Sequence, residues 1–301
     1  MPRRDLGLAL LVVAVWGLNF VVIEVGLREL PPLLFVGLRF LVTALPAVFL
    51  VRRPDVPWRV LVALGLLMCV GQFGFLFTGM SQGMPAGLTS VVMQSQALFT
   101  VLFAAIALRE RPRPVQLAGL AVAAGGMVLI GLHRGAGIPG VALMLLLAGA
   151  ACWGAANVVT RAAGPVRPLP LLVWSSLVAP LPLFALSALL EGPARDVAAL
   201  RSADLGALGS LAYVVVLATF GGFGIWYWLL GRHPSSLVAP FSLLVPVTGL
   251  SSAWLLLGED PSAWQLAGCA LAVGGVALVV LGGRRAAVPA SSAPAVPLSA
   301  P

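Results

Sequence analysis

Long apolar segments follow one another along the whole chain, and short stretches rich in Pro, Gly and Arg separate them. A helix needs roughly 18 or more apolar residues to cross a hydrocarbon core of about 30 Å. We expect helices over 6–25, 31–51, 59–79, 85–108, 114–132, 138–160, 168–190, 204–230, 234–257 and 263–282. Because backbone groups in lipid must be paired within the structure that spans it, this pattern predicts an all-α membrane protein with ten transmembrane helices.

The second half of the chain repeats motifs of the first half. The matched motifs are Trp16-Gly17 with Trp153-Gly154, Gly71-Gln72-Phe73-Gly74 with Gly221-Gly222-Phe223-Gly224, Glu110 with Glu259, and Gln116-Leu117-Ala118-Gly119 with Gln265-Leu266-Ala267-Gly268. We expect one five-helix repeat over 1–132 and a second over 138–283. Because five is odd, the two repeats must insert in opposite orientations. Such inverted repeats are a recurrent transporter design, with the solute site near mid-membrane between them.

The composition agrees with a membrane protein. Charged residues make up 9% of the chain and apolar residues 60%, whereas a soluble domain has about 25% charged residues. The first apolar run resembles a signal peptide, but it continues to Ile23 without a convincing cleavage motif, so we expect an uncleaved first helix. Residues 284–301, rich in Pro, Ala and Ser, are expected to form a disordered cytoplasmic tail.

The net charge of +8 does not indicate nucleic-acid binding, because the arginines lie in short loops between apolar segments. With the N-terminus inside, the inner loops and ends hold Arg3, Arg4, Arg52, Arg53, Arg59, Arg109, Arg111, Arg113, Arg161, Arg167, Arg232, Arg284 and Arg285. The outer loops then hold Arg28, Arg134, Arg195 and Arg201. The positive-inside rule therefore predicts that both termini are cytoplasmic.

Four stretches of the chain resemble a known family. LLVVAVWGLNFVVIEVGL, PPLLFVGLRF, GMPAGLTSVVMQSQALFT and FSLLVPVTGLSSAWLLLGE are similar to the drug/metabolite transporter superfamily, specifically its EamA family. The likeness runs from about residue 5 to 283 and implies ten helices in a bacterial inner membrane. It also implies export of cysteine, O-acetylserine or related metabolites. The family's relatives often carry a basic residue where this chain has Glu24, so no role is carried over to Glu24.

Polar side chains within the apolar segments need a partner, a cavity or a function, because burying them in hydrocarbon is costly. Asn19 follows Trp16 by three residues, and Asn157 follows Trp153 by four, so each pair shares a helix face. The two amides are expected either to form hydrogen bonds between helices or to bind a zwitterionic solute.

Arg39 is the one fixed charge deep within an expected helix, and the repeat places Ser175 at the matching position. It could extend toward the outer interface, pair with helix ends or with Glu24, or bind a solute carboxylate through its two-pronged guanidinium.

Aromatic and amide side chains complete the expected solute pathway. Gln72 and Phe75 share a face of the third helix, and the eighth carries Phe223, Trp226 and Tyr227 at helical spacing, where plain packing is the alternative. Gln94 and Gln96 cannot share one face of a regular helix, and we favour Gln94 as the pathway residue. Pro240 and Pro246 are expected either to kink the ninth helix for gating or simply to bend it.

Catalytic and cofactor motifs do not emerge from the sequence. His133 and His233 fall in loops, and Cys69, Cys152 and Cys269 are too far apart for metal-ligand spacing, so we expect no metal and no cofactor. An enzyme acting on lipid would need clustered acids and bases, whereas the ten acidic residues are scattered.

The sequence therefore favours a monomeric secondary transporter that exports small amino-acid-type solutes. A carrier of other amino acids or drugs is the alternative, and a multi-span membrane enzyme is the less favoured reading. Glu24 lies at the outer end of the first helix, so we expect facilitated flow down the solute gradient rather than proton coupling through a buried carboxylate.

Overall fold

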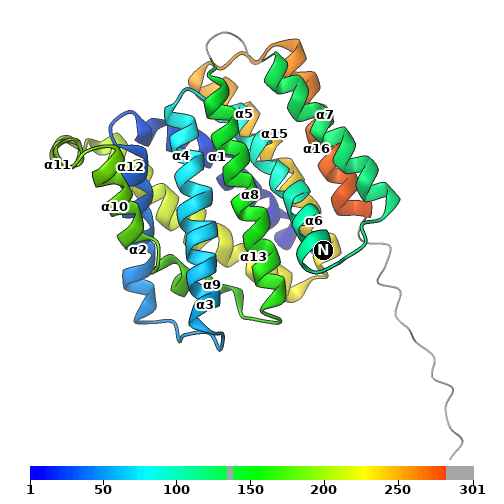
Figure 1. The fold of residues 1–301 in the computed structure, drawn as a ribbon, viewed down its shortest axis with the longest axis horizontal. Coiled ribbons are helices and arrows are strands. Elements are labelled where there is room, and N and C mark those ends of the chain that lie inside the picture. Colours follow the sequence, from blue (N-terminus) through cyan, green and yellow to red (C-terminus); the bar gives the residue numbers. More distant parts are fainter. Residues whose placement is uncertain (134–137, 283–301) are drawn as a thin grey trace, which may run out of the picture.

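The computed structural model describes residues 1–133 and 138–282, and the expected tail over 284–301 lies outside them. The described part of the chain is all helical (Figure 1). Within it, nine helices are long and apolar enough to cross a membrane, by length and composition. The tenth expected helix, at 31–51, is α2 (Pro32–Val48), which is apolar but has only 17 residues.

Four spans are regular helices from one end to the other. They are α1 (Arg3–Leu27), α7 (Pro114–Leu132), α8 (Gly140–Ala162) and α16 (Ala263–Gly282), the first and last helices of the two matched segments, 1–132 and 138–283. Pro31, Arg113 and Pro139 precede helices, where a missing or unpaired N–H is tolerated.

Four further spans change helix type along their length. Those of the first segment are α3 (Trp58–Leu64), η1 (Gly65–Gln72) and α4 (Phe73–Ser81), then α5 (Ala86–Val92), η2 (Met93–Ser95) and α6 (Gln96–Ala107). Those of the second are α12 (Leu205–Ala212), η3 (Tyr213–Phe223) and α13 (Gly224–Arg232), then α14 (Ser235–Val238), η4 (Ala239–Leu244) and α15 (Val245–Leu257). η1 and η3 are π-helical and occupy matched positions, and π-helical turns often mark functional sites.

The region between 168 and 203 differs from its counterpart in the first segment. The expected helix at 168–190 is divided into α9 (Pro168–Ser176) and α10 (Pro180–Leu190), because Pro180 and Pro182 cannot donate the backbone bonds that a continuous helix needs. The expected loop near 191–203 contains a further helix, α11 (Pro193–Ser202), beside α10 and α12 in Figure 1.

Helices from the two segments pack in a reciprocal pattern. α1 packs against α15 and η3, while its counterpart α8 packs against α6 and η1. α7 and α16, the last helices of the two segments, form a close pair at one side of the bundle (Figure 1). Large apolar side chains such as Phe49, Leu181 and Leu205 remain exposed on the outside, as expected of a surface that faces lipid.

Candidate functional site

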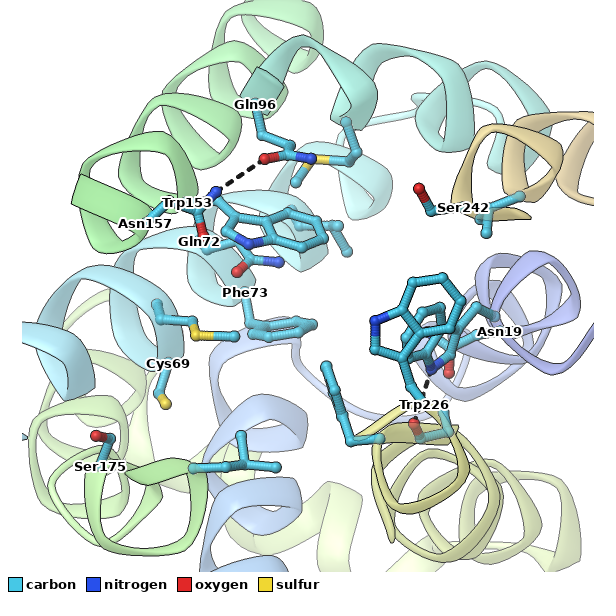
Figure 2. Close-up of a pocket in the computed structure, with 18 of the residues that line it drawn as sticks. Asn19, Cys69, Gln72, Phe73, Gln96, Trp153, Asn157, Ser175, Trp226 and Ser242 are labelled. Atoms are coloured by element: carbon cyan, nitrogen blue, oxygen red, sulfur yellow. Dashed lines mark hydrogen bonds between the residues drawn. The ribbon is translucent and has the colours of Figure 1, made fainter. Parts of the chain in front are cut away.

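A cavity of about 530 Å³ lies among helices of both segments (Figure 2). Cavities of about 300 to 1,000 Å³ accommodate small molecules. Ten of the residues expected along the pathway line it, namely Trp16, Asn19, Arg39, Gln72, Gln94, Trp153, Asn157, Phe223, Trp226 and Tyr227. The helical spacing that grouped these residues in the sequence therefore agrees with their position around one cavity.

Phe75 is the exception among the expected lining residues. It lies three residues after Gln72, which turns its side chain about 60° around the helix. A Cβ on Gly149 of α8 would lie 3.4 Å from the Cβ of Phe75, so the two helices are in close contact there. The Phe75 side chain lines a second cavity with Glu24 and Arg28 instead of the central one. The expected common pathway face of Gln72 and Phe75 is therefore not present.

Aromatic rings from α1, η3 and α13 form one wall of the cavity. The Trp16 ring centroid lies 5.1 Å from that of Phe223 and 5.3 Å from that of Trp226. Phe223 in turn stacks on Tyr227 at 5.8 Å. The Trp16 indole Nε1–H donates to the Ala218 carbonyl at 3.0 Å, which fixes the ring against the π-helical segment. Trp153 lies across the view from Trp226 in Figure 2.

Amide side chains join the helices around a second part of the cavity. Asn157 Nδ2 donates to Gln96 Oε1 at 3.1 Å and to Thr100 Oγ1 at 3.0 Å, so α8 is tied to α6. Gln94 Nε2 donates to the Ser242 carbonyl at 3.2 Å. Both Gln94 and Gln96 line the cavity, contrary to the expectation that only one would do so, because Met93–Ser95 is a 3₁₀ turn rather than regular α-helix.

Two other amides lining the cavity have oxygens without a partner. Asn19 Oδ1 and Gln72 Oε1 are buried and accept no hydrogen bond from the described residues. Gln72 is only 2% exposed. Asn19 thus differs from its sequence counterpart Asn157, whose amide is used between helices.

Arg39 of α2 is 3% exposed and lines the cavity. Its Nη2 donates to Thr219 Oγ1 at 3.2 Å, and its guanidinium carbon lies 3.9 Å from the centroid of the Phe73 ring. Nε and Nη1 are buried without a partner. The described ion pairs are Arg161–Glu110 and His233–Asp5, so the structure has no pairing of Arg39 with Glu24.

The cavity extends to Thr160 and Pro168, beside the termini of α8 and α9. Along another side α1, α5 and α15 are in close contact, since a Cβ on Gly17 would lie 1.9 Å from Thr248 Oγ1 and a Cβ on Gly249 would lie 2.5 Å from the Ser90 side chain. These glycines permit the three helices to approach closely beside the cavity.

Glu259 joins the segment that follows α15 to the start of α5. Its carboxylate accepts hydrogen bonds from the backbone N–H groups of Ala86 at 2.6 Å and Gly87 at 3.0 Å, at the start of α5. Burial raises the pKa of Glu259 above its ordinary value, and the two N–H groups act in the opposite direction. Its counterpart Glu110 instead pairs with Arg161 at 2.6 Å on the exposed surface.

The two expected kink prolines lie where the ninth span changes helix type. Pro240 falls in the 3₁₀ segment η4, and Pro246 is in the first turn of α15. Neither side chain lines the cavity, although their neighbours Ser242 and Val245 do.

Sequence reasoning missed several residues that the fold brings to the cavity. Phe73, Met68 and Cys69 line it beside Arg39, and Figure 2 shows Phe73 near its centre. Contact between Phe73 and Arg39 depends on how α2 and α4 pack, and no local pattern reports that. Within residues 1–133 and 138–282, no group of three or more His, Cys, Asp or Glu side chains is placed to hold a metal ion.

Comparison with known proteins relates the chain to transporters. The model of the EamA-like transporter family matches residues 5–132 and again 140–281. The "Probable amino-acid metabolite efflux pump" of Salmonella typhimurium is 48% identical over 290 residues, covering 94% of this chain and 97% of the relative. The protein of the same name in Escherichia coli is 44% identical with the same coverage. A solved crystal structure aligns with a TM-score of 0.61 at 22% identity, over 95% of this chain and 99% of that one, which shows the fold alone.

Proposed function

The chain belongs to the EamA-like transporter family, and we propose that it is a secondary transporter that exports small amino-acid-type metabolites across the bacterial inner membrane. Cysteine and O-acetylserine are the first candidates for its cargo. Ten of the residues that line the central cavity form the proposed solute pathway. The observation that carries this proposal is the combination of aromatic, amide and guanidinium groups in one cavity, which suits a small amphiphilic zwitterion.

The relatives support export rather than a lipid-modifying enzyme. Two proteins that match 94% of this chain are named as amino-acid metabolite efflux pumps. The alternative within transport is a carrier of other amino acids or drugs, because aromatic walls are also suited to larger apolar solutes.

The proposed architecture consists of ten spans in two inverted repeats, over 1–132 and 138–283, acting as a monomer. The family model matches each segment separately, and the reciprocal packing of α1 with α15 and of α8 with α6 supports a two-fold relation. α2 would be the tenth span in this arrangement. The arginine distribution supports cytoplasmic termini, in which case the end of the cavity at Thr160 and Pro168 is the cytoplasmic one.

Rocking of the two repeats about the cavity would then expose it to each side in turn. We propose that the described conformation, in which the cavity extends to Thr160, is the state that accepts solute from the cytoplasm. Pro240 and Pro246 are proposed to give the ninth span the bend that this motion requires.

The experiment is solute counterflow in proteoliposomes that contain the purified protein. We expect liposomes preloaded with unlabelled L-cysteine or O-acetylserine to take up the labelled solute faster than protein-free liposomes. Uptake of a drug-like cation with no uptake from a panel of amino acids would instead support the alternative cargo. Reporter fusions at the C-terminus test the orientation, and a periplasmic signal would contradict it.

A further inference from the structure

Arg39 is a buried cation without a matching anion in the described structure. Its side chain leaves α2 to line the central cavity and is 3% exposed. The single protein hydrogen bond of its guanidinium goes to Thr219 Oγ1, a neutral hydroxyl at 3.2 Å. A guanidinium carries five N–H donors and stays protonated, so most of its hydrogen-bonding capacity is unused.

Leaving such a group unpaired is costly. A buried charge loses its hydration, and a neutral partner restores only part of what is lost. Nε and Nη1 are both buried and both without a partner. A purely structural arginine would be expected to use these donors on a carboxylate or on carbonyl groups. Two unpartnered donors on a side chain that lines a cavity point to a ligand that brings an anion.

Aromatic contacts hold the guanidinium in place without using its N–H groups. The guanidinium carbon lies 3.9 Å from the centroid of the Phe73 ring and 5.2 Å from that of Phe40. A cation above a ring is attracted through the face of the guanidinium, whereas its N–H groups lie in its plane. This arrangement fixes the position of the charge and leaves the edge of the group for a planar anion such as a carboxylate.

We propose that Arg39 binds the carboxylate of the exported solute, and that the side-chain oxygens of Gln72 and Asn19 accept hydrogen bonds from its ammonium group. The solute class is therefore a zwitterion with a free carboxylate, and a cation or a carboxyl ester is excluded. This assignment rests on the proposed function and specifies the chemistry of its site.

The acceptors complement the arginine in both chemistry and position. Gln72 Oε1 and Asn19 Oδ1 are buried and unpartnered, and both residues line the same cavity as Arg39. Gln72 directly precedes Phe73, whose ring lies against the Arg39 guanidinium. Figure 2 shows Gln72 and Phe73 close together, and Asn19 on the opposite side of the view beside Trp226. The cavity thus has unused donors and unused acceptors on different helices, as a zwitterion requires.

The sequence counterpart of Arg39 carries no charge. Ser175 lines the cavity at the matching position, and its Oγ is also buried without a partner. One cation facing one cavity gives the solute a single preferred orientation, with its carboxylate toward α2. A pair of arginines related by the repeat would not distinguish two orientations.

The test compares a carboxylate with its ester. Proteoliposomes take up labelled L-cysteine by counterflow, and unlabelled L-cysteine or L-cysteine methyl ester competes. For the unmodified protein we expect the ester to compete at least about tenfold more weakly, because hydrogen bonds to a charged group are among the strong ones. In Arg39→Gln we expect uptake to fall at least about tenfold and the preference for the acid over the ester to disappear.

Two further variants separate binding from folding. Thr219→Val removes the one protein hydrogen bond of Arg39 and should retain the preference for the acid. Arg39→Lys keeps the charge and should retain a weaker preference, which can be read even if Arg39→Gln does not fold. Uptake by the unmodified protein together with an unchanged acid-to-ester preference in the Arg39 variants would overturn the carboxylate site alone. Absence of amino-acid uptake by the unmodified protein would overturn the proposed function and this site with it.

Discussion

Both segments contribute to the pair of α7 and α16, and both contribute to the central cavity. The two regions differ in whether matched residues of the two segments make equivalent contacts. In the pair of α7 and α16, matched glycines make equivalent contacts. A Cβ on Gly119 would lie 2.7 Å from the Gly275 carbonyl oxygen, and a Cβ on Gly126 would lie 2.6 Å from that of Gly268. In the reverse direction, a Cβ on Gly275 would lie 2.6 Å from the Gly119 carbonyl oxygen and a Cβ on Gly268 would lie 3.0 Å from that of Gly126, so the glycines of each helix face those of the other.

At the cavity, matched polar residues of the two segments differ in their hydrogen bonds or in their identity. Asn157 is bonded to two side chains, while the Asn19 oxygen has no partner. Arg39 faces the cavity where the other segment has Ser175. Close packing needs only small residues and is satisfied by a symmetric pair, whereas a solute with two different ends is bound best by an asymmetric site. The asymmetry therefore separates the proposed binding surface from the scaffold.

The largest expected effect concerns the scaffold. Gly126→Val places a side chain against the Ala272 and Gly268 backbone, which would lie 2.5 and 2.6 Å from the new Cβ. Because helix backbone cannot yield as a flexible side chain can, we expect a loss of at least about 1 to 3 kcal/mol, the range for overpacking, and little folded protein.

Gly125→Val is the matched control, since nothing lies within 4 Å of a Cβ there. The measurement is the melting temperature and the monodisperse yield of both variants in detergent. The pair Gly275→Val and Gly274→Val repeats the comparison on α16, where only the former would meet backbone. Equal melting of the Gly125 and Gly126 variants would mean that the close approach of the two helices is not needed for stability.

The sequence predicted the helical spans and ten of the residues that line the cavity, because both follow from local signals. The apolar run and its Pro and Arg boundaries locate a span, and a spacing of three or four residues groups Trp16 with Asn19. What it could not predict depends on contacts between helices. The shortness of α2, the helix α11 in an expected loop and the ring of Phe73 beneath Arg39 follow from packing. The 3₁₀ turn that brings both Gln94 and Gln96 to the cavity likewise has no clear local signal.

The next prediction compares how much Asn157 and Asn19 contribute to stability. Asn157→Ala removes the bonds between α8 and α6, and we expect a loss of about 0.6 to 2 kcal/mol of stability, the range for such bonds in membranes. Asn19→Ala removes no hydrogen bond of its Oδ1, so its melting temperature should change little.

Transport should respond in the opposite order. We expect Asn19→Ala to lower the affinity for labelled L-cysteine in counterflow by about tenfold, which corresponds to one hydrogen bond to a charged group. Thermal melting and concentration-dependent uptake of both variants are the measurements. If both variants lose stability and keep the same apparent affinity, the two amides have the same structural role and the asymmetry has no functional meaning.

A comparable effect is expected from the first of the two matched glutamates and a smaller one from the second. Glu259→Gln weakens two charge-assisted bonds to the start of α5, and we expect a loss of about 1 to 2 kcal/mol. Glu110→Gln breaks a pair with Arg161 whose side chains are 43% and 53% exposed, and such pairs contribute about 0 to 1 kcal/mol. Melting of the two variants at low and high salt is the measurement, and a larger loss for Glu110→Gln would mean that the exposed ion pair stabilises the fold more than the bonds of Glu259 do.

The smallest expected effect concerns Glu24, near the C-terminal end of α1. Glu24 does not line the central cavity but a second one, which it shares with Arg28, Glu191 and Arg195. A proton relay for transport would need a titratable group that meets the solute site. Arg39 cannot serve as one, because its guanidinium stays protonated. We therefore expect Glu24→Gln to change L-cysteine counterflow by less than about twofold, and an imposed pH gradient to drive no accumulation against the solute gradient.

Glu29→Gln, on the exposed turn after α1, controls for the loss of one surface charge. Uphill uptake driven by the pH gradient and lost in Glu24→Gln would show that the second cavity takes part in coupling, and that the asymmetry between the two segments includes a proton site.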